Sequence, residues 1–206
     1  MTRTLVSLLV LATTLLVVAA AATAAAPSVT ISASRPSVVY GGSVTLSGKI
    51  SDSTAGQPVD VLAQPFDASI FSKLASATTT ASGQWTEVVK PTVETSYEAN
   101  WMSTTSSTVT VKVRPMITLA LVNLSSGAFS TKVTAARSFA GKFVLVQRLS
   151  SSGVLTLKKV TLDANSSATF RVRLHHGRSR LRVVMPSSQT ARDYITGMSN
   201  VLTVRR

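Results

Sequence analysis

Arginine is the residue type whose spacing most clearly suggests chemistry in this chain of 206 residues. Two stretches, 170–174 and 178–183, alternate arginine with apolar residues. Because successive side chains of a β-strand point to opposite faces, this alternation predicts arginines on one face of each strand. A guanidinium group binds anions well. The candidate residues for binding an anionic polymer are therefore Arg171, Arg173, Arg178, Arg180 and Arg182.

How these arginines are grouped depends on how the two stretches pair. A hairpin turning at His176-Gly177 would place Arg171 opposite Arg182. It would also place Arg173 opposite Arg180, and like charges directly opposite destabilise a sheet unless an anion lies between them. The internal repeat of the chain instead aligns the two stretches with strands that cross from one sheet to the other. We therefore expect the arginines on two different outer faces.

Residues for acid–base or nucleophilic catalysis are scarce. The chain has two His, eight carboxylates and no Cys, which excludes a thiol nucleophile and a thiolate metal site. His175 and His176 are adjacent and would point to opposite faces of a strand, and no motif links them to Asp193. We expect two exposed turn histidines, with no catalytic residue, no cofactor and no metal site. The protein is therefore expected not to be an enzyme, and a hydrolase would require turnover that His175→Ala abolishes.

The two tryptophans allow two interpretations. They could form a platform that stacks against sugars. However, Trp101 shares its strand face with Tyr97 and Ala99, a pattern typical of a core. We therefore expect Trp85 and Trp101 to be buried.

Charge is distributed unevenly along the chain, whose formal net charge is +13. Residues 27–115 contain six basic and six acidic residues, whereas residues 116–206 contain fourteen basic and two acidic residues, a net charge of +12. This asymmetry predicts two domains, 27–114 and 116–206, joined by a short linker at Val113-Arg114-Pro115. The charge of the second domain either keeps the protein soluble or attracts a polyanion.

A period of two in hydropathy predicts strands throughout, and no stretch sustains a helical period. The first segment predicts strands near 29–35, 43–50, 58–65, 72–80, 84–90, 95–102 and 107–113. The second segment repeats the plan near 117–122, 128–136, 142–149, 154–162, 167–174, 179–185 and 199–205. Seven short strands separated by turn signals are typical of an immunoglobulin-like sandwich. The predicted fold is all-β, with two tandem immunoglobulin-like Greek-key β-sandwiches after an N-terminal signal peptide.

A family resemblance is found in the sequence of residues 34–48, which reads Ser-Arg-Pro-Ser-Val-Val-Tyr-Gly-Gly-Ser-Val-Thr-Leu-Ser-Gly. Both segments resemble the bacterial immunoglobulin-like repeats of secreted and cell-surface proteins of high-GC Gram-positive bacteria. The stretch 91–99 also resembles a tyrosine corner, in which the Tyr97 hydroxyl would bond to nearby backbone. The resemblance implies the fold and an extracellular location, but its motifs are turn and core residues and imply no ligand.

Residues 1–26 have the three parts of a secretory signal peptide. Arg3 precedes an apolar stretch at 5–18, and the triplet Ala22-Thr23-Ala24 fits the cleavage site. The alternative is a retained anchor, because 5–22 is nearly long enough to span a bilayer. After cleavage no membrane span remains, and we expect a secreted protein that is retained non-covalently, if at all, on the cell envelope.

Two functions remain open. The first is a secreted, non-enzymatic binding or structural protein whose basic second domain associates with anionic envelope polymers or acidic polysaccharide. Nucleic acid is not expected as a partner, because export removes the chain from the cytosol. The second is a protein–protein adhesin or assembly subunit that uses a sheet edge or the loop 187–200. Long loops are often functional, and Arg192, Tyr194 and Ile195 would form a small hot spot there, unless the loop is an ordinary connection.

Overall fold

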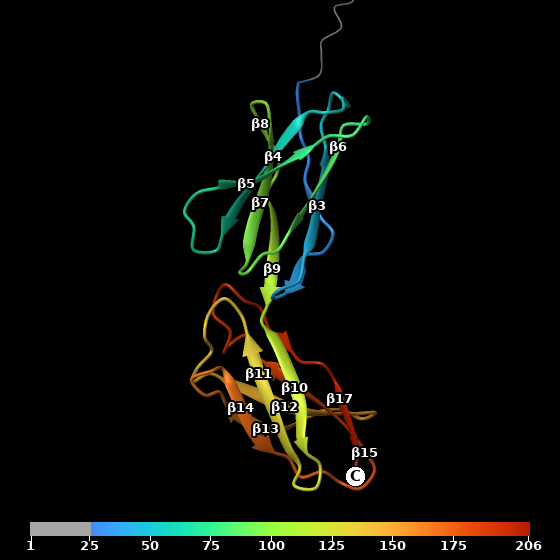
Figure 1. The fold of residues 1–206 in the computed structure, drawn as a ribbon, viewed down its shortest axis with the longest axis vertical. Helices are drawn as coiled ribbons and strands as arrows, with labels where there is room; N and C mark the ends of the chain where they lie inside the picture. Colours follow the sequence, from blue (N-terminus) through green and yellow to red (C-terminus); the bar gives the residue numbers. More distant parts are fainter. Residues whose placement is uncertain (1–25) are drawn as a thin grey trace, which may run out of the picture.

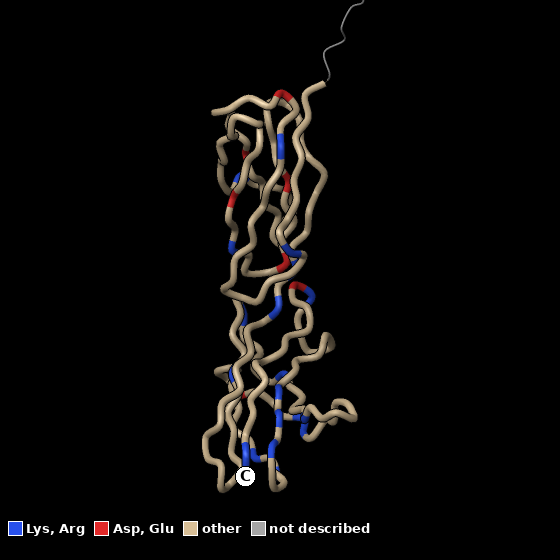
Figure 2. Tube along the Cα trace, turned by 90° about the vertical axis from the view of Figure 1, so that its right-hand side faces the viewer, with Lys and Arg blue, Asp and Glu red and all other residues tan. Residues whose placement is uncertain are grey.

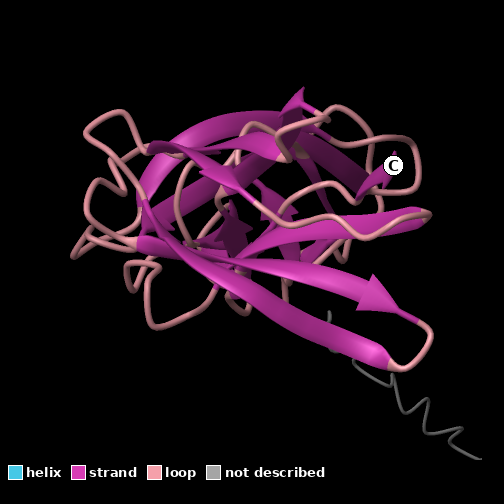
Figure 3. Cartoon of the chain, turned by 90° about the horizontal axis from the view of Figure 1, so that it is seen from below, coloured by secondary structure: helices cyan, strands magenta, loops and turns pink. Residues whose placement is uncertain are grey.

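Residues 26–206 are described by the computed structural model, and they form β-strands joined by turns and loops (Figure 3). The all-β prediction is confirmed. The predicted signal peptide lies, except for Ala26, outside the described residues. Residues 26–206 contain no helix that is long and apolar enough to cross a membrane.

The first half of the chain, residues 27–114, forms two sheets. One sheet has the strand order β1-β3-β6, and the other has the order β2-β9-β7-β4-β5, with β8 paired to β7. The strands are β1 (Ser32–Ala33), β2 (Ser37–Val39), β3 (Val44–Lys49), β4 (Pro58–Pro65), β5 (Ser72–Thr78), β6 (Gln84–Val89), β7 (Thr95–Trp101), β8 (Thr104–Thr105) and β9 (Val109–Arg114).

The second half, residues 116–206, repeats this arrangement. One sheet has the order β10-β11-β14, and the other has the order β13-β12-β15-β16, with β17 also paired to β15. The strands are β10 (Met116–Asn123), β11 (Ala128–Thr134), β12 (Phe143–Ser150), β13 (Gly153–Thr161), β14 (Ser167–Arg171), β15 (Arg178–Met185), β16 (Gly197–Met198) and β17 (Leu202–Arg205).

The core of each half is built by alternate residues of facing sheets. Along β7 every second side chain is buried, and both predicted core tryptophans are buried, with Trp85 1% and Trp101 3% exposed. Fully burying an aromatic or branched side chain contributes about 1.5–3 kcal/mol. The tryptophans therefore fill the interior and form no sugar-stacking platform.

The strand predicted near 29–35 is shorter in the structure, where it is β1, and the unpredicted strand β2 follows it in the other sheet. β1 pairs antiparallel with β3, whereas β2 pairs parallel with β9. Pro36 lies between them and has no N–H to donate to the first sheet. The chain therefore leaves one sheet and joins the other at this residue.

The strand predicted near 199–205 is also interrupted. The Asn200 side chain accepts a hydrogen bond from the Leu119 amide (3.2 Å) and donates one to the Leu119 carbonyl (3.4 Å). This side chain thus bonds the backbone of β10 in the opposite sheet, and β16 and β17 lie on either side of it. The sequence showed no signal for this bridge.

The two halves lie end to end, as Figure 1 shows. β9 ends at Arg114 and β10 begins at Met116, so only Pro115 separates the last strand of one half from the first strand of the other. A Cβ on Gly197 would lie 2.8 Å from Cγ of Pro115, which shows how closely β16 packs on this connection.

Candidate anion-binding site

The connection after β14 separates the two groups of predicted arginines. β14 pairs with β11, whereas β15 pairs with β12, so the chain crosses from one sheet to the other between them. Arg171 lies at the end of β14, and Arg173 follows it. Arg178, Arg180 and Arg182 lie on β15. The crossover prediction is confirmed, and the hairpin that would face Arg171 with Arg182 does not form.

The β15 arginines point outward, because the residues alternating with them are buried. Arg178 lies opposite Arg205 of β17, which places two like charges side by side. Arg182 is half-buried, and its Nε donates a 2.9 Å hydrogen bond to Oε1 of Gln147. Arg178 and Arg180 are exposed and form no ion pair in the described part of the chain.

A second basic group surrounds a pocket of about 300 Å³ between the edge strands β13 and β14. These strands belong to opposite sheets and lie next to one another on the same side of the second half (Figure 1). The pocket is lined by four cations and a histidine, together with three apolar side chains. These are Arg148, Lys158, Arg171, Arg173 and His175, with Leu155, Leu157 and Val172. No carboxylate lines it.

Arg148 is half-buried and lines this pocket from β12. On β12 the residues Val144 and Val146 are fully buried, and Arg148 continues the same strand face. Its neighbours across the sheet are Leu181 and Leu155. The Nη2 atom donates a 3.3 Å hydrogen bond to the carbonyl of Arg173, whereas the Nε atom is buried and has no hydrogen-bond partner among residues 26–206. Arg148 therefore directs an unsatisfied cationic donor toward the interior of the second half.

The two carboxylates of the second half are engaged elsewhere. Oδ1 of Asp163 accepts hydrogen bonds from the amides of Asn165 (2.8 Å) and Ser167 (2.9 Å) in the turn before β14. Asp193 is 1% exposed and pairs with Arg137. Figure 2 shows that Lys and Arg dominate the charged positions of this half. Among the described residues 116–206, the other thirteen basic residues therefore have no carboxylate to neutralise them.

His175 and His176 are both exposed in the connection between β14 and β15, as the sequence predicted. Only His175 reaches the pocket lining. Within residues 26–206, no three His, Asp or Glu side chains come together in a way that could hold a metal ion.

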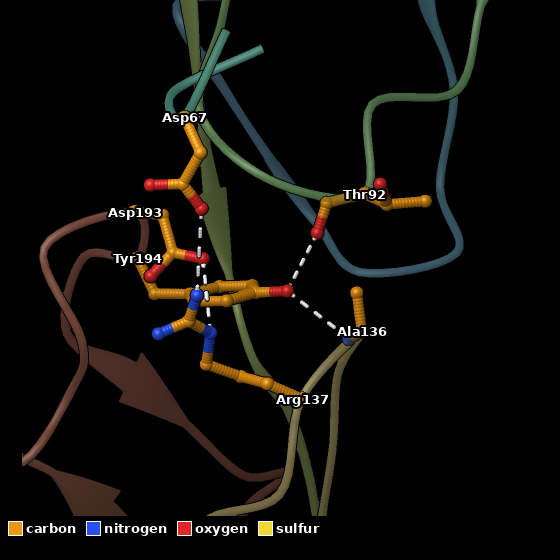
Figure 4. A network of polar contacts seen from close by, with 6 residues as sticks. All are labelled: Asp67, Thr92, Ala136, Arg137, Asp193 and Tyr194. Carbon is orange, nitrogen blue, oxygen red and sulfur yellow. Dashed lines mark hydrogen bonds and ion pairs between the residues drawn. The ribbon is translucent and has the colours of Figure 1, made fainter.

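The loop predicted as a protein-interaction site instead joins the two halves of the chain (Figure 4). Tyr194 is 3% exposed, and its hydroxyl donates a 2.6 Å hydrogen bond to the carbonyl of Thr92 in the first half. The same hydroxyl accepts a 3.0 Å hydrogen bond from the Ala136 amide. Burial raises the pKa of Tyr194 above its ordinary value. The exposed hot spot expected at Tyr194 is therefore wrong: the ring fills an intramolecular junction.

Neighbouring residues of the loop strengthen this junction. The Ile195 amide donates to the Val113 carbonyl (2.9 Å), and an Arg114 guanidinium nitrogen donates to the Thr196 carbonyl (2.8 Å). Ile195 is half-buried, and of the three predicted hot-spot residues only Arg192 is exposed. The loop is thus an ordered connection that holds the halves together.

An ion-pair network completes the junction. Arg137 Nε lies 3.2 Å from Oδ2 of Asp193, and its Nη2 lies 3.7 Å from Oδ2 of Asp67 in the first half. The pair with Asp193 is too poorly aligned to count as a hydrogen bond, so neither oxygen of Asp193 has a hydrogen-bond donor. Of the described cations, only Arg137 therefore balances the Asp193 charge.

Sequence reasoning identified Arg171 and Arg173 but missed Arg148 and Lys158. The period of two in 143–149 places Arg148 on the face of Val144 and Val146, and this signal could have marked it as a cation facing the core. Lys158 carries no comparable signal, because its position in the pocket depends on how β13 lies beside β14.

Comparisons with known proteins assign no family to this chain. No family model and no curated protein matches it. Among solved structures it is similar to a tetra-tandem repeat in the extending region of a large adhesion protein, with 16% identity and a TM-score of 0.37 over 87% of this chain and 49% of that one. It is also similar to native E. coli alpha-2-macroglobulin (14% identity, TM-score 0.33, 86% of this chain and 14% of that one). Dimeric latent PorU from Porphyromonas gingivalis is a third (11% identity, TM-score 0.30, 87% and 24%).

The chain spans less than two thirds of each of these proteins. TM-scores below 0.5 and identities of 16% or less make the likenesses too weak to indicate a ligand or an activity. The function is therefore inferred from the side chains of this protein.

Proposed function

We propose that the protein is a secreted, non-enzymatic binding module whose basic second half, residues 116–206, associates with anionic polymers of the cell envelope. The observation that carries this proposal is the missing counter-charge of that half. Of its two carboxylates, one caps a turn and the other lies buried against Arg137. The exposed cations therefore repel one another, and a polyanion at the surface relieves that repulsion.

The placement of the cations supports a polymer as the ligand. The Arg178–Arg205 pair lies on the outer face of one sheet, whereas Arg171 and Arg173 lie beside the edge of the other. A small anion reaches one of these groups, but a polymer with many charges contacts several together. Such binding must weaken as salt screens the charges.

The test is co-sedimentation of residues 27–206 with isolated cell envelopes across a salt series. The variant Arg178→Gln/Arg180→Gln/Arg205→Gln removes three exposed charges from the second half. At about 0.5 kcal/mol for each exposed contact, the loss is about tenfold in affinity. A control variant, Arg35→Gln/Lys49→Gln/Lys112→Gln, removes three exposed charges from the first half and should bind almost as well as the wild type. Equal losses in both variants, or binding that persists at high salt, would exclude this function.

The second candidate, a protein partner, has one specific site in its favour. β5 is an edge strand, and Leu74 on it is 53% exposed. In the loop before it, Ile70 is 74% and Phe66 is 43% exposed. Binding through these apolar side chains would persist at salt concentrations that release a polyanion, so the same salt series separates the two functions.

A further inference from the structure

We infer that the pocket around Arg148 binds a phosphodiester group of an anionic polymer. This inference rests on the proposed function and specifies the chemistry of its ligand. Arg148 is energetically costly to the fold. A cation that faces a core without a carboxylate partner is unfavourable, because it loses hydration and gains no opposite charge.

Protection of a sheet edge does not account for Arg148. Inward-pointing charges are one device by which edge strands avoid pairing with other chains. β12, however, lies between β13 and β15 and has no free edge along the residues that pair on both sides. Arg148 also lies opposite Leu181, which is fully buried, on the inward face of β12, so it does not serve as a solubilising surface charge. A ligand that brings its own negative charge does account for it.

The directions of the donors favour phosphate over carboxylate. Arg148 approaches the pocket from β12, Lys158 from β13 and Arg171 from β14, while Arg173 and His175 follow β14 along the chain. A carboxylate offers two oxygens in one plane. A phosphate is tetrahedral and presents oxygens to donors on several sides, and guanidinium groups match its geometry. Cations that come from three different strands around one pocket therefore suit a phosphate better than a carboxylate.

The other residues of the pocket indicate that the phosphate is a diester within a polymeric ligand. Leu155, Leu157 and Val172 provide apolar surface beside the cations, which suits the carbon atoms of an alcohol joined to the phosphate. A second hollow of about 400 Å³ shares Arg148 and Leu155 with the first and is lined by Ser150 and Ser152 of the β12–β13 hairpin. A polymer of phosphate and polyol units can thus continue past Arg148 on both sides, with serine hydroxyls available to its hydroxyl groups.

The decisive variant is Arg148→Met, which keeps most of the aliphatic volume and removes the charge. Residues 27–206 are titrated with a glycerol–phosphate–glycerol diester, and binding is followed by calorimetry and by NMR. The wild type should bind saturably, and Arg148→Met should bind at least about tenfold more weakly, as expected for the loss of charged hydrogen bonds. The matched control Lys112→Gln removes one exposed charge from β9 of the first half, outside the pocket, and should leave the affinity unchanged.

A thermal readout separates a ligand-binding role from a structural one. If Arg148 is retained for binding, Arg148→Met raises the melting temperature while it weakens diester binding at least about tenfold. A lower melting temperature together with unchanged affinity would overturn the inference. Lys158→Gln, at an exposed position where folding is not at risk, should also weaken diester binding.

Two further titrations test which kind of anionic group the pocket binds. Glycerol 3-phosphate tests a terminal monoester, and acetate tests a carboxylate. Diester binding that exceeds both supports the inference, whereas tighter binding of the monoester or equal binding of acetate contradicts it. If envelopes bind at low salt but the diester does not, this inference fails and the proposed function stands. If envelopes do not bind at all, the proposed function fails whatever the pocket binds.

Discussion

The junction between the two halves should lose stability when Arg137 is replaced by alanine. Asp193 is 1% exposed, and in the described part of the chain Arg137 is the one cation that pairs with it, at 3.2 Å. Breaking a buried ion pair by removing one member typically costs about 3–5 kcal/mol, because the remaining charge stays buried and unpaired. Since the Arg137 side chain is 45% exposed and partly screened by water, we expect about 2–3 kcal/mol for Arg137→Ala.

This cost can be measured by calorimetry of residues 27–206. For a chain of this length, a destabilisation of 2–3 kcal/mol lowers the melting temperature by about 4–12 °C. The double variant Arg137→Ala/Asp193→Asn should recover most of the loss, because it removes the charge that the single variant leaves unpaired. Arg192→Ala is the matched control. Arg192 is exposed and precedes Asp193 in the chain, and replacing it should change the free energy of unfolding by less than about 0.5 kcal/mol.

Two results would refute this reasoning about the junction. One is an Arg137→Ala variant as stable as Arg192→Ala, which would mean that water reaches Asp193. The other is a double variant no more stable than the single one, which would assign the loss to the packing of the arginine stem and not to the Asp193 charge.

Three further predictions concern single side chains. Tyr194→Phe should cost about 1–3 kcal/mol in thermal unfolding, because it leaves the Ala136 amide without its hydrogen-bond acceptor; an unchanged melting temperature would argue against that bond. Gly127 has φ +62°, and a Cβ there would collide with the Val172 carbonyl. Gly141 has a similar φ of +73° but open space around it, so Gly141→Ala should lower the free energy of unfolding by about 1 kcal/mol. Gly127→Ala should lower it at least twice as much, as measured by thermal unfolding. Burial raises the pKa of Tyr97 to about 12. The stability that depends on its neutral hydroxyl is therefore fully present below pH 10 and declines by about 2–3 kcal/mol as the pH rises to 12, and urea unfolding of Tyr97→Phe should show less of this decline.

Much of the strand plan could be predicted from the sequence. The stretches 43–50 and 108–113 alternate apolar and polar residues, and β3 and β9 occupy almost the same residues. The burial of Trp101 also followed from the face it shares with Tyr97. In these places local hydropathy and the final packing favour the same structure, and neither depends on a distant segment.

The candidate site could be predicted only in part. The crossover after β14 followed from the internal repeat, and Arg171 and Arg173 were identified by their alternation with apolar residues. The pocket itself depends on β13 of one sheet lying beside β14 of the other. That contact joins residues of two sheets whose register no local pattern specifies, so Arg148 and Lys158 were not linked to the arginines of β14.

The role of the loop 187–200 illustrates the same division most clearly. Its length, its tyrosine and its charged residues are typical of an exposed binding loop, and the sequence by itself determined that the segment is neither strand nor helix over most of its length. Only the tertiary structure decided that Tyr194 bonds to Thr92, which precedes it by 102 residues. An amphipathic side chain is equally suited to a partner protein and to a neighbouring half of its own chain. Which of the two it meets is set by the single residue, Pro115, that separates β9 from β10 and brings the first half within reach.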